Sequence, residues 1–402
     1  MQYDANETSL QQLLSESVFD AAERARTAFD RIAGPLNRSL VLFGAGGMGR
    51  KTLLGLKKLG LEPLAFADNN PALWSRRVSD VPVLSPQEAA IKYGRTATFV
   101  VTIWRGEGTE QMGQRMKQLL DLGCERVVPF GQLFWKYPGV FTPHYAFDLP
   151  EGVLREKDPV RRAYSLFADE ASRREYLAQI RWRLHLDFDG LPLPVSHTIY
   201  FPDDIASPQD EVFVDAGAYD GDTIRTLLAR TPGQGSEVIA FEPDPLNFAK
   251  LNRYVDTLPE EVKRRIELHS MGLGSKHETV FFEGSGTSAA TVASSGVQVA
   301  IAPLDELIGD RRITYLKMDI EGAELDALQG ARNCIQRNTP LLTVCSYHKQ
   351  DHLWRIPLLI HSICDRYRFF LRPHLLEVWD LVCYAVPEHR LVCRPQNSRK
   401  QR

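Results

Sequence analysis

The second half of the chain alternates between short apolar runs, rich in β-branched and aromatic residues, and segments whose apolar positions recur at helical spacing. Runs of this composition predict buried strands, and they cover 211–215, 237–242, 265–271, 313–318, 340–347, 367–372 and 379–386. Helical patterns separate the early runs and predict parallel pairing, whereas the last two runs lie close together and predict a terminal antiparallel hairpin. An insertion at 279–302 predicts a small β excursion over the functional site.

A similar alternation fills residues 38–135. Its first strand, 40–43, precedes a loop with the G-x-G-x-x-G spacing, and a helix is predicted over 50–59. The next strand ends in an acidic residue, at the position that meets a ribose in dinucleotide-binding folds. The sequence therefore predicts an α/β protein with two Rossmann-like parallel-sheet domains. The candidate nucleotide site of the first domain consists of Gly44, Gly46, Gly49 and Asp68.

The segments around the two domains have patterns of their own. Helical spacing predicts helices over 7–33 and 158–188, and the Pro-rich stretch 191–210 is expected to wrap one edge of the second domain and to line its site. The expected organisation is N-terminal helices in 1–37, the first domain in 38–135, a Pro-containing connector and helical segment in 136–200, the second domain in 201–393, and a polar, disordered tail in 394–402.

Composition places the chain among ordinary globular proteins. Apolar residues make up 44% and charged residues 25%, and the net charge of -3 gives no reason to expect nucleic acid or an anionic membrane as partner. No apolar run is long enough to span a bilayer and no signal-peptide pattern precedes the first helix, so we expect a cytoplasmic protein. The six cysteines form no C-x-x-C pair and are interpreted as buried, reduced thiols. Both a monomer and a homo-oligomer are compatible with these properties.

The segment EVFVDAGAYDGD, residues 211–222, indicates a ligand site in the second domain. Its strand closes with Asp215, and Gly217 and Gly221 permit a tight turn and a close approach of the backbone to a ligand. About 20 residues later, the next strand ends in Glu242, where a carboxylate would bind the two hydroxyls of a ribose.

Two further strand ends carry titratable residues. The strand 313–318 is followed by Asp319, Glu321 and Glu324, and the strand 340–347 by His348. If these strands are neighbours, the side chains meet at one sheet edge, because ligands bind beyond the carboxyl ends of parallel strands.

Two roles are open for His348. It is a candidate base for a hydroxyl group, or, with Asp319 and Glu321, a candidate ligand of Mg²⁺ or Ca²⁺. Helix capping alone would account for Glu324, and His352 is expected to face solvent.

Four segments, VDAGAYDGD, FEPDP, VAIAPLDEL and LKMDIEGAE, resemble in order and spacing the FkbM family of class I S-adenosylmethionine (SAM) methyltransferases. The resemblance covers roughly 200–387, although Tyr219 stands where the class at large has a further glycine. It implies a class I methyltransferase fold and SAM-dependent methyl transfer to a hydroxyl of a sugar, nucleotide-sugar or glycan-type acceptor. The residues implied to hold SAM are Asp215, Gly217, Ala218, Gly221, Asp222, Glu242 and Met271, and those implied to face the acceptor are Asp319, Glu321 and His348.

The first domain has a resemblance of its own. The run GAGGMG…FADNNPALWSRRVSDVPVLSP is similar to the nucleotide-sugar-binding domain found on some bacterial sugar acetyltransferases. The domain then either binds a nucleotide or nucleotide-sugar, or only positions and dimerises the enzyme. Two alternatives to a methyltransferase stay open, an NAD(P)-dependent oxidoreductase or epimerase run by the first domain and a non-catalytic nucleotide-binding assembly protein. Against the first, no Tyr-x-x-x-Lys pair follows the strands of that domain.

Overall fold

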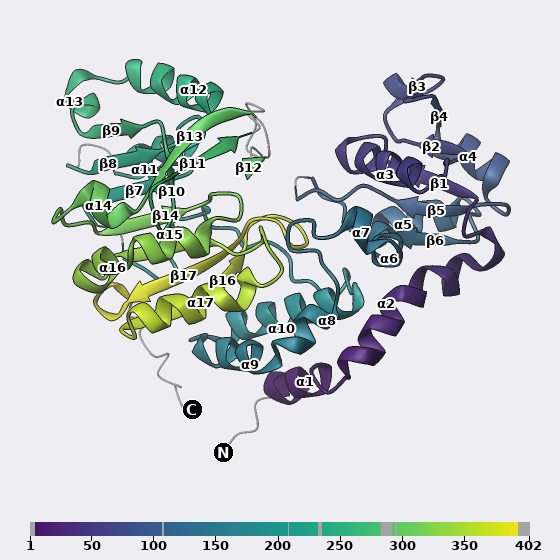
Figure 1. Cartoon of the computed structure of the whole chain (residues 1–402), viewed down its shortest axis with the longest axis horizontal. Coiled ribbons are helices and arrows are strands. Elements are labelled where there is room, and N and C mark those ends of the chain that lie inside the picture. The colour runs from purple at the N-terminus through teal and green to yellow at the C-terminus, as the bar shows by residue number, and fades with distance from the viewer. Residues whose placement is uncertain are drawn as a thin grey trace, which may run out of the picture.

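The structure is a computed structural model of the chain, and it describes residues 5–106, 108–207, 209–231, 235–282, 292–293 and 296–392. Figure 1 shows two α/β lobes that are connected along one side by a layer of helices and that approach each other at the centre. The predicted fold class is confirmed. The predicted disordered tail, 394–402, lies outside the described residues, as does Cys393, whereas the other five cysteines are buried and free.

The two N-terminal helices, α1 (Ala5–Leu13) and α2 (Val18–Ala33), connect the lobes. Ser17 caps α2 by accepting a hydrogen bond from the Asp20 backbone N–H, and Gly34 ends it with a φ of 55°. The buried face of α2 is a stripe at a spacing of four residues, Ala21, Ala25, Phe29 and Ala33. Ala21 packs into the core of the second domain and the other three into the core of the first, so α2 fixes the two domains relative to each other.

The first domain is a six-stranded sheet in the order β3-β4-β2-β1-β5-β6, parallel except for β3. Its strands are β1 (Leu40–Phe43), β2 (Ala65–Ala67), β3 (Arg77–Val78), β4 (Val81–Leu84), β5 (Thr98–Val101) and β6 (Val127–Pro129). Its helices are α3 (Gly47–Lys58), α4 (Pro86–Tyr93) and α5 (Met112–Asp121), with a short 3₁₀ turn, η2 (Pro71–Leu73). The predicted first strand and glycine-loop helix are present, and the helix begins three residues earlier than predicted, directly inside the loop.

The connector contains more helix than its proline content predicts. After α6 (Phe130–Lys136), two short helices, α7 (Pro138–Phe141) and α8 (Glu151–Arg155), lie in the predicted connector. The helical pattern over 158–188 consists of two helices, α9 (Lys157–Leu166) and α10 (Glu170–His185), and Asp169 caps the second by accepting from the Ser172 backbone N–H. The prolines of α7 and α8 stand at helix starts, where the missing N–H has no intrahelical partner to lose.

The second domain is a seven-stranded sheet in the order β16-β17-β15-β14-β7-β8-β9. Its strands are β7 (Val212–Ala216), β8 (Glu237–Phe241), β9 (Ile266–His269), β14 (Tyr315–Met318), β15 (Leu341–Cys345), β16 (Tyr367–Pro373) and β17 (Leu381–Pro387). The first five are parallel, and β17 lies antiparallel between β15 and β16. The predicted terminal hairpin is therefore confirmed, and β14 and β15 are neighbours, as the argument about Asp319 and His348 requires.

Helices cover both faces of this sheet (Figure 1). They are α11 (Asp222–Arg230), α12 (Pro245–Asp256), α13 (Glu260–Lys263), α14 (Leu304–Ile308), α15 (Glu324–Gly330), α16 (Arg332–Asn338) and α17 (His352–Ile363), followed by the 3₁₀ turn η3 (Glu388–Arg390). The predicted β excursion forms a small sheet of β10 (Gly272–Leu273), β11 (Glu278–Phe282), β12 (Val292–Ala293) and β13 (Val297–Ala302). In the described part of the chain, no helix combines the length and the apolar character needed to cross a bilayer.

Candidate active site

A cavity of about 420 Å³ opens at the carboxyl ends of β7, β8 and β14. Its volume lies within the range of about 300–1,000 Å³ that is typical of small-molecule sites. We call it the strand-end cavity, and among the residues that line it are Gly217, Tyr219, Glu242, Asn247, Asp319, Glu321 and Lys349. Of the seven residues predicted to hold a cofactor, Gly217 and Glu242 line this cavity.

The loop after β7 owes its path to two residues with positive φ. Gly217 has a φ of 80°, and a Cβ at this position would lie 1.9 Å from the Asp319 carbonyl oxygen, so only glycine lets the two loops touch. Tyr219 has a φ of 49°, in the left-handed region that a glycine would occupy at no steric cost. Tyr219 therefore takes the conformation of the glycine that it replaces.

Glu242 holds the same loop from the neighbouring strand. Its two carboxylate oxygens accept hydrogen bonds from the backbone N–H groups of Tyr219 and Asp244, each at 2.8 Å. Burial raises the pKa of Glu242 to about 7, although both hydrogen bonds oppose that shift. A ligand that donates hydroxyl hydrogens to this carboxylate would favour its charged form.

The other five predicted cofactor residues do not line the cavity. Asp215 is fully buried within β7, with a carboxylate oxygen 3.0 Å from Nζ of Lys317, which also donates to the Gly217 carbonyl oxygen at 2.6 Å. Burial raises the pKa of Asp215 to about 6 against the pull of Lys317. Ala218, Gly221, Asp222 and Met271 are also outside the cavity lining, and Gly221, with a φ of 89°, starts α11.

The predicted acceptor residues meet beside the cavity, which Asp319 and Glu321 also line. Nε2 of His348 lies 3.3 Å from Oδ1 of Asp319 and 3.8 Å from Oε2 of Glu321. Glu321 and Gly322 follow β14 with φ values of 53° and 103°. A non-glycine residue in the left-handed region stores strain that is concentrated at functional sites, and here the strained turn points the Glu321 carboxylate toward His348.

Glu324 does more than cap α15. It is fully buried, and its Oε1 lies 2.6 Å from Nδ1 of His348 and accepts from the backbone N–H of Ile320 at 3.1 Å. Its Oε2 lies 3.2 Å from Nδ1 of His352. The expectation that His352 faces solvent is wrong, because α17 begins at this residue and turns its side chain inward, where it is fully buried.

We call Asp319, Glu321, Glu324 and His348 the acidic cluster. The charges in this cluster shift the pKa values of its members. Burial disfavours the imidazolium of His348, but Glu324, Asp319 and Glu321 outweigh burial and raise the pKa of His348 to about 9. Burial raises the pKa of Glu321 to about 8 despite His348. Glu324 behaves in the opposite way, because its two histidine neighbours overcome burial and hold its pKa well below the ordinary value.

Two tyrosines from outside the predicted motifs complete the site. The hydroxyl of Tyr200, in the Pro-rich stretch, donates to Oδ2 of Asp319 at 2.7 Å, so this stretch lines the site as expected. Tyr145 comes from the connector, and its ring lies 6.3 Å from that of His348. Burial raises the pKa of Tyr145 to about 12, with further contributions from Glu321 and Asp319. The sequence carries no periodic signal for either tyrosine, since both stand in irregular segments.

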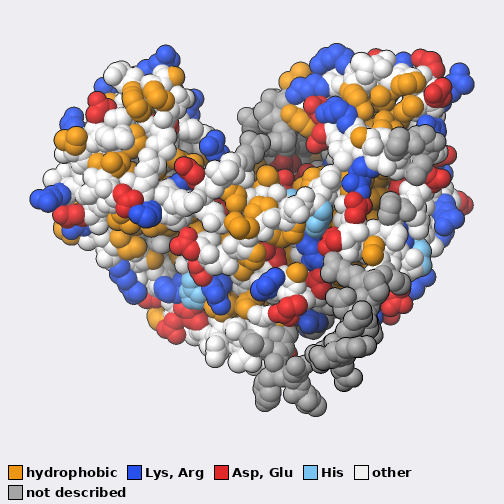
Figure 2. Space-filling model, turned by 180° about the vertical axis from the view of Figure 1, so that it is seen from behind, with side chains coloured by type: hydrophobic (Ala, Val, Ile, Leu, Met, Phe, Trp, Pro, Cys, Tyr) orange, Lys and Arg blue, Asp and Glu red, His pale blue; other side chains and the backbone are white. Residues whose placement is uncertain are grey.

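Aromatic side chains form the wall next to the acidic cluster. Trp379, in the turn between β16 and β17, packs against Tyr145 at 5.0 Å and Tyr347 at 5.9 Å between ring centroids. It also lies 4.8 Å from Trp104, which follows β5 of the first domain. We call Tyr145, Tyr347 and Trp379 the aromatic wall. Figure 2 shows the hollow between the two lobes, with hydrophobic and acidic side chains on its floor. The contact between Trp104 and Trp379 places the aromatic wall at the domain junction.

In the first domain, the residues of the predicted nucleotide site lie together at the loop after β1. Oδ2 of Asp68 accepts from the Ala45 backbone N–H at 2.7 Å, across the loop after β1. A Cβ on Gly49 would lie 1.9 Å from the Gly44 carbonyl oxygen, whereas a Cβ on Gly46 would meet no atom within 4 Å. Gly49 is therefore needed for packing, and Gly46 leaves open space above the loop.

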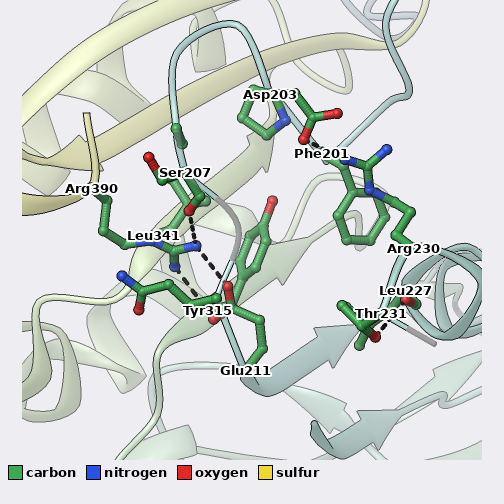
Figure 3. Close-up of a pocket in the computed structure, with 13 residues that line it drawn as sticks. Phe201, Asp203, Ser207, Glu211, Leu227, Arg230, Thr231, Tyr315, Leu341 and Arg390 are labelled. Carbon is green, nitrogen blue, oxygen red and sulfur yellow. Dashed lines mark hydrogen bonds and ion pairs between the residues drawn. The ribbon is translucent and has the colours of Figure 1, made fainter. Parts of the chain in front are cut away.

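A second cavity, of about 230 Å³, lies at the opposite edge of the second sheet, beside the amino ends of β7, β14 and β15 (Figure 3). Its charged side chains are paired. Arg390 binds Glu211 at 2.6 Å and the Ser207 carbonyl oxygen at 2.9 Å, and Arg230 binds Asp203. These contacts attach the C-terminal segment to the start of the sheet, which is a structural role.

Residues 215–374 match the family model of the methyltransferase FkbM domain. This part of the chain is an FkbM methyltransferase domain. The matched residues run from Asp215 in β7 to the β16–β17 turn, so they include the acidic cluster and all the residues that line the strand-end cavity. The resemblance read from the sequence is confirmed for this domain.

Two relatives extend this comparison. A protein from Beauveria bassiana (strain ARSEF 2860), Methyltransferase 1, is 26% identical over 152 residues, which are 31% of this chain and 59% of that protein. The crystal structure of methyltransferase FkbM from Methylobacillus flagellatus KT superposes with a TM-score of 0.75 at 24% identity, over 95% of this chain and 99% of that one. The FkbM domain, its helical connector and the first domain thus form an arrangement that a solved structure shares as a whole.

Proposed function

We propose that the chain is a SAM-dependent O-methyltransferase that uses the strand-end cavity for its cofactor and the acidic cluster for the acceptor hydroxyl. The observation that carries the proposal is the arrangement of both at one sheet edge of the FkbM domain, with Asp319 and Glu321 lining the cavity and also lying beside His348. One set of loops then positions both reactants, which is the main requirement of an in-line transfer.

The residues that would hold the cofactor fit its groups. Glu242 presents a carboxylate to the ribose hydroxyls, and Gly217 gives the backbone access that no larger residue allows. SAM supplies an electrophilic methyl group, whose bond to sulfur breaks, with the electron pair staying on sulfur, as the bond to the acceptor oxygen forms. The acidic cluster positions the acceptor oxygen and removes its proton, which typically contributes 10²–10⁴-fold to the rate.

For the acceptor we propose a sugar hydroxyl, carried on a nucleotide or a glycan. The aromatic wall offers ring faces for the apolar face of a sugar, and the acidic cluster accepts hydrogen bonds from its hydroxyls. Trp104 stands at the carboxyl end of β5, the sheet edge that also carries the glycine loop of the first domain, and it contacts Trp379. A nucleotide-sugar held by the first domain would thus extend toward the acidic cluster. The FkbM match favours methyl transfer over the oxidoreductase alternative.

Calorimetry and a transfer assay test this function. The full chain should bind SAM and S-adenosylhomocysteine, and transfer a labelled methyl group to at least one compound in a panel of free sugars, nucleotide-sugars and oligosaccharides. Titrations with NAD⁺, NADP⁺ and a uridine-diphosphate sugar report separately on the first domain. Failure of the folded chain to bind either SAM or S-adenosylhomocysteine at millimolar concentration would exclude the proposal.

A further inference from the structure

We propose that Asp319, Glu321 and His348 bind a divalent metal ion of the Mg²⁺ and Mn²⁺ class, and that this ion binds the acceptor hydroxyl. The inference rests on the proposed function only for its last part, since the metal site itself follows from the side chains present. The three donors come from the end of β14, the strained turn after it and the end of β15.

The first observation is an unpartnered donor atom. The His348 side chain is 1% exposed, and its Nε2 has no hydrogen-bond partner among the residues that the structure describes, although Oδ1 of Asp319 is only 3.3 Å away. Within the same described part of the chain, Oε2 of Glu321 is also buried without a hydrogen-bond partner, 3.8 Å from the same nitrogen. A buried polar atom without a partner is expensive, so two of them that face each other indicate a ligand between them.

The surroundings of His348 determine which of its nitrogens faces that ligand. A hydrogen bond between Nδ1 and the Glu324 carboxylate at 2.6 Å places the ring proton on Nδ1. In that tautomer Nε2 points its lone pair at the two carboxylate oxygens, and a metal ion between these atoms would take the place of the second proton that an imidazolium carries there. A histidine whose other nitrogen donates to a carboxylate is the usual form of a metal-ligating histidine.

The two carboxylate oxygens of Asp319 likewise have different neighbours. Oδ2 accepts from the Tyr200 hydroxyl at 2.7 Å, which fixes the carboxylate and leaves Oδ1 toward Nε2. The ligand oxygens are therefore held by neighbours that do not occupy the ligand position.

The distances from Nε2 of His348 to the two carboxylates suit a six-coordinate ion. Adjacent ligands on an octahedral ion with bonds of about 2.1–2.4 Å are about 3.0–3.4 Å apart. The distance of 3.3 Å between Nε2 and Oδ1 of Asp319 falls in this range, and that of 3.8 Å to Oε2 of Glu321 enters it with a small side-chain movement.

Two carboxylates with one imidazole suit a hard ion of the Mg²⁺ or Mn²⁺ type. Asp319 and Glu321 both line the strand-end cavity, so the remaining coordination positions are open to an acceptor hydroxyl and water. Such an ion lowers the pKa of a bound hydroxyl, and the proton leaves to solvent.

Mn²⁺ titration of the full, chelator-treated chain tests the site, followed by electron paramagnetic resonance and calorimetry in the presence of S-adenosylhomocysteine. That product analogue has no sulfonium charge, so it cannot replace the ion electrostatically. We expect one Mn²⁺ per chain, displaced by Mg²⁺, with at least tenfold weaker binding in Glu321→Gln and in Asp319→Asn. Asp256→Asn is the matched control, because Asp256 is an exposed carboxylate at the end of α12, outside the cavity lining, and its loss changes the charge equally.

Absence of a bound Mn²⁺ at millimolar concentration in the wild-type chain overturns the metal site, as does equal weakening by Asp256→Asn and Glu321→Gln. Circular dichroism melting shows whether each variant is folded, and Asp319→Asn and Glu321→Gln serve as independent variants of one site. S-adenosylhomocysteine binding in the same samples separates the two ideas. If the chain binds S-adenosylhomocysteine but not Mn²⁺, only the metal proposal fails. If the chain binds Mn²⁺ but not S-adenosylhomocysteine, only the cofactor assignment fails.

Discussion

Nδ1 of His348 and Oε1 of Glu324 lie 2.6 Å apart in a fully buried pair. His348 follows β15, and Glu324 begins α15, the helix after β14. The contact therefore joins the ends of two neighbouring strands. Glu324 thereby sets the ring orientation and tautomer of His348, whichever role the opposite nitrogen performs. The contact makes Glu324 a positioning residue.

Substitution of this pair should separate positioning from reaction. We expect His348→Ala to lower kcat by about 10²–10⁴-fold, the range for removal of a placed base, and Glu324→Gln to lower it by about 10–100-fold, the range for a residue that orients a ligand. SAM affinity should stay within threefold in both variants, because neither side chain lines the strand-end cavity. Kinetics on an acceptor found in the transfer assay, with calorimetry of SAM, measure both quantities.

Asp256→Asn again provides the control, since it removes an exposed carboxylate that lies outside the strand-end cavity. Full activity of His348→Ala would contradict both roles of the histidine and would move the search for a base to Asp319, Glu321 and Tyr347. Treatment with EDTA then distinguishes the roles, because chelation stops a metal-dependent reaction and leaves a reaction that uses only a base unchanged.

Loss of the Glu242 carboxylate should weaken SAM binding by at least tenfold. The side chain contributes twice, as the expected ribose partner and as acceptor for the Tyr219 and Asp244 backbone groups that shape the loop. Calorimetry of Glu242→Ala and Glu242→Gln against SAM is the measurement. Glu237→Ala is the matched control, because Glu237 starts the same strand at its opposite, exposed end. Equal affinity in a folded Glu242→Ala protein would remove Glu242 from the cofactor site.

Tyr145 should act on the acceptor and not on the cofactor. Its ring contacts Trp379 and lies near His348, whereas the strand-end cavity is lined by other residues. We expect Tyr145→Ala to raise KM for the acceptor about tenfold, as for the loss of a buried aromatic contact of about 1.4 kcal/mol, with SAM affinity unchanged. Tyr145→Phe keeps the ring and isolates the hydroxyl. A change in SAM affinity that matches the change in KM would show that the effect is structural.

Two glycines of the first domain should respond differently to alanine. Gly46→Ala places a methyl group in open space above the loop, where a phosphate would lie, so we expect an unchanged melting temperature and lost nucleotide-sugar binding. Gly49→Ala collides with the Gly44 carbonyl oxygen and should destabilise the domain by about 1–3 kcal/mol. Calorimetry and thermal melting of the full chain measure these effects. If the wild-type chain binds no nucleotide, NAD(P) or nucleotide-sugar, the first domain acts as a scaffold.

The junction between the domains should make stability depend on pH. Oε1 of Glu377 accepts from the Met112 backbone N–H at 2.6 Å and lies 3.9 Å from Arg115, and burial raises the pKa of Glu377 to about 7. A group whose pKa is raised in the folded state contributes its stability fully below the unfolded pKa, about 4.5, and loses it as the pH rises through about 7. The wild-type chain should therefore lose on the order of 2–3 kcal/mol from pH 5 to pH 8 relative to Glu377→Gln.

Denaturant unfolding of the two proteins at several pH values in this range measures that difference. The glutamine keeps an acceptor for the Met112 N–H and cannot ionise, so it isolates the titration from the packing. Parallel stability curves for the two proteins would show that Glu377 does not titrate there.

The sequence by itself determined where the strands lie along the chain and where the loops between them lie. Apolar runs, helical spacing and glycines are local signals, because burial of a strand and the turn after it depend on residues next to one another. The sequence argument assumed that the strands before Asp319 and His348 are neighbours, and the pairing of β14 with β15 confirms that assumption. The FkbM resemblance rested on these local runs as well.

Only the tertiary structure decided the partners of the buried side chains. Tyr200 reaches Asp319 across 119 residues of sequence, and Tyr145 arrives from a connector without periodicity. Asp215 was predicted to close its strand, but β7 continues to Ala216, so Asp215 lies within the strand and pairs with Lys317, and His352 turns inward to Glu324. Such contacts depend on which elements pack together and on the desolvation of charges between them, and neither quantity is encoded in the spacing of residues along one segment.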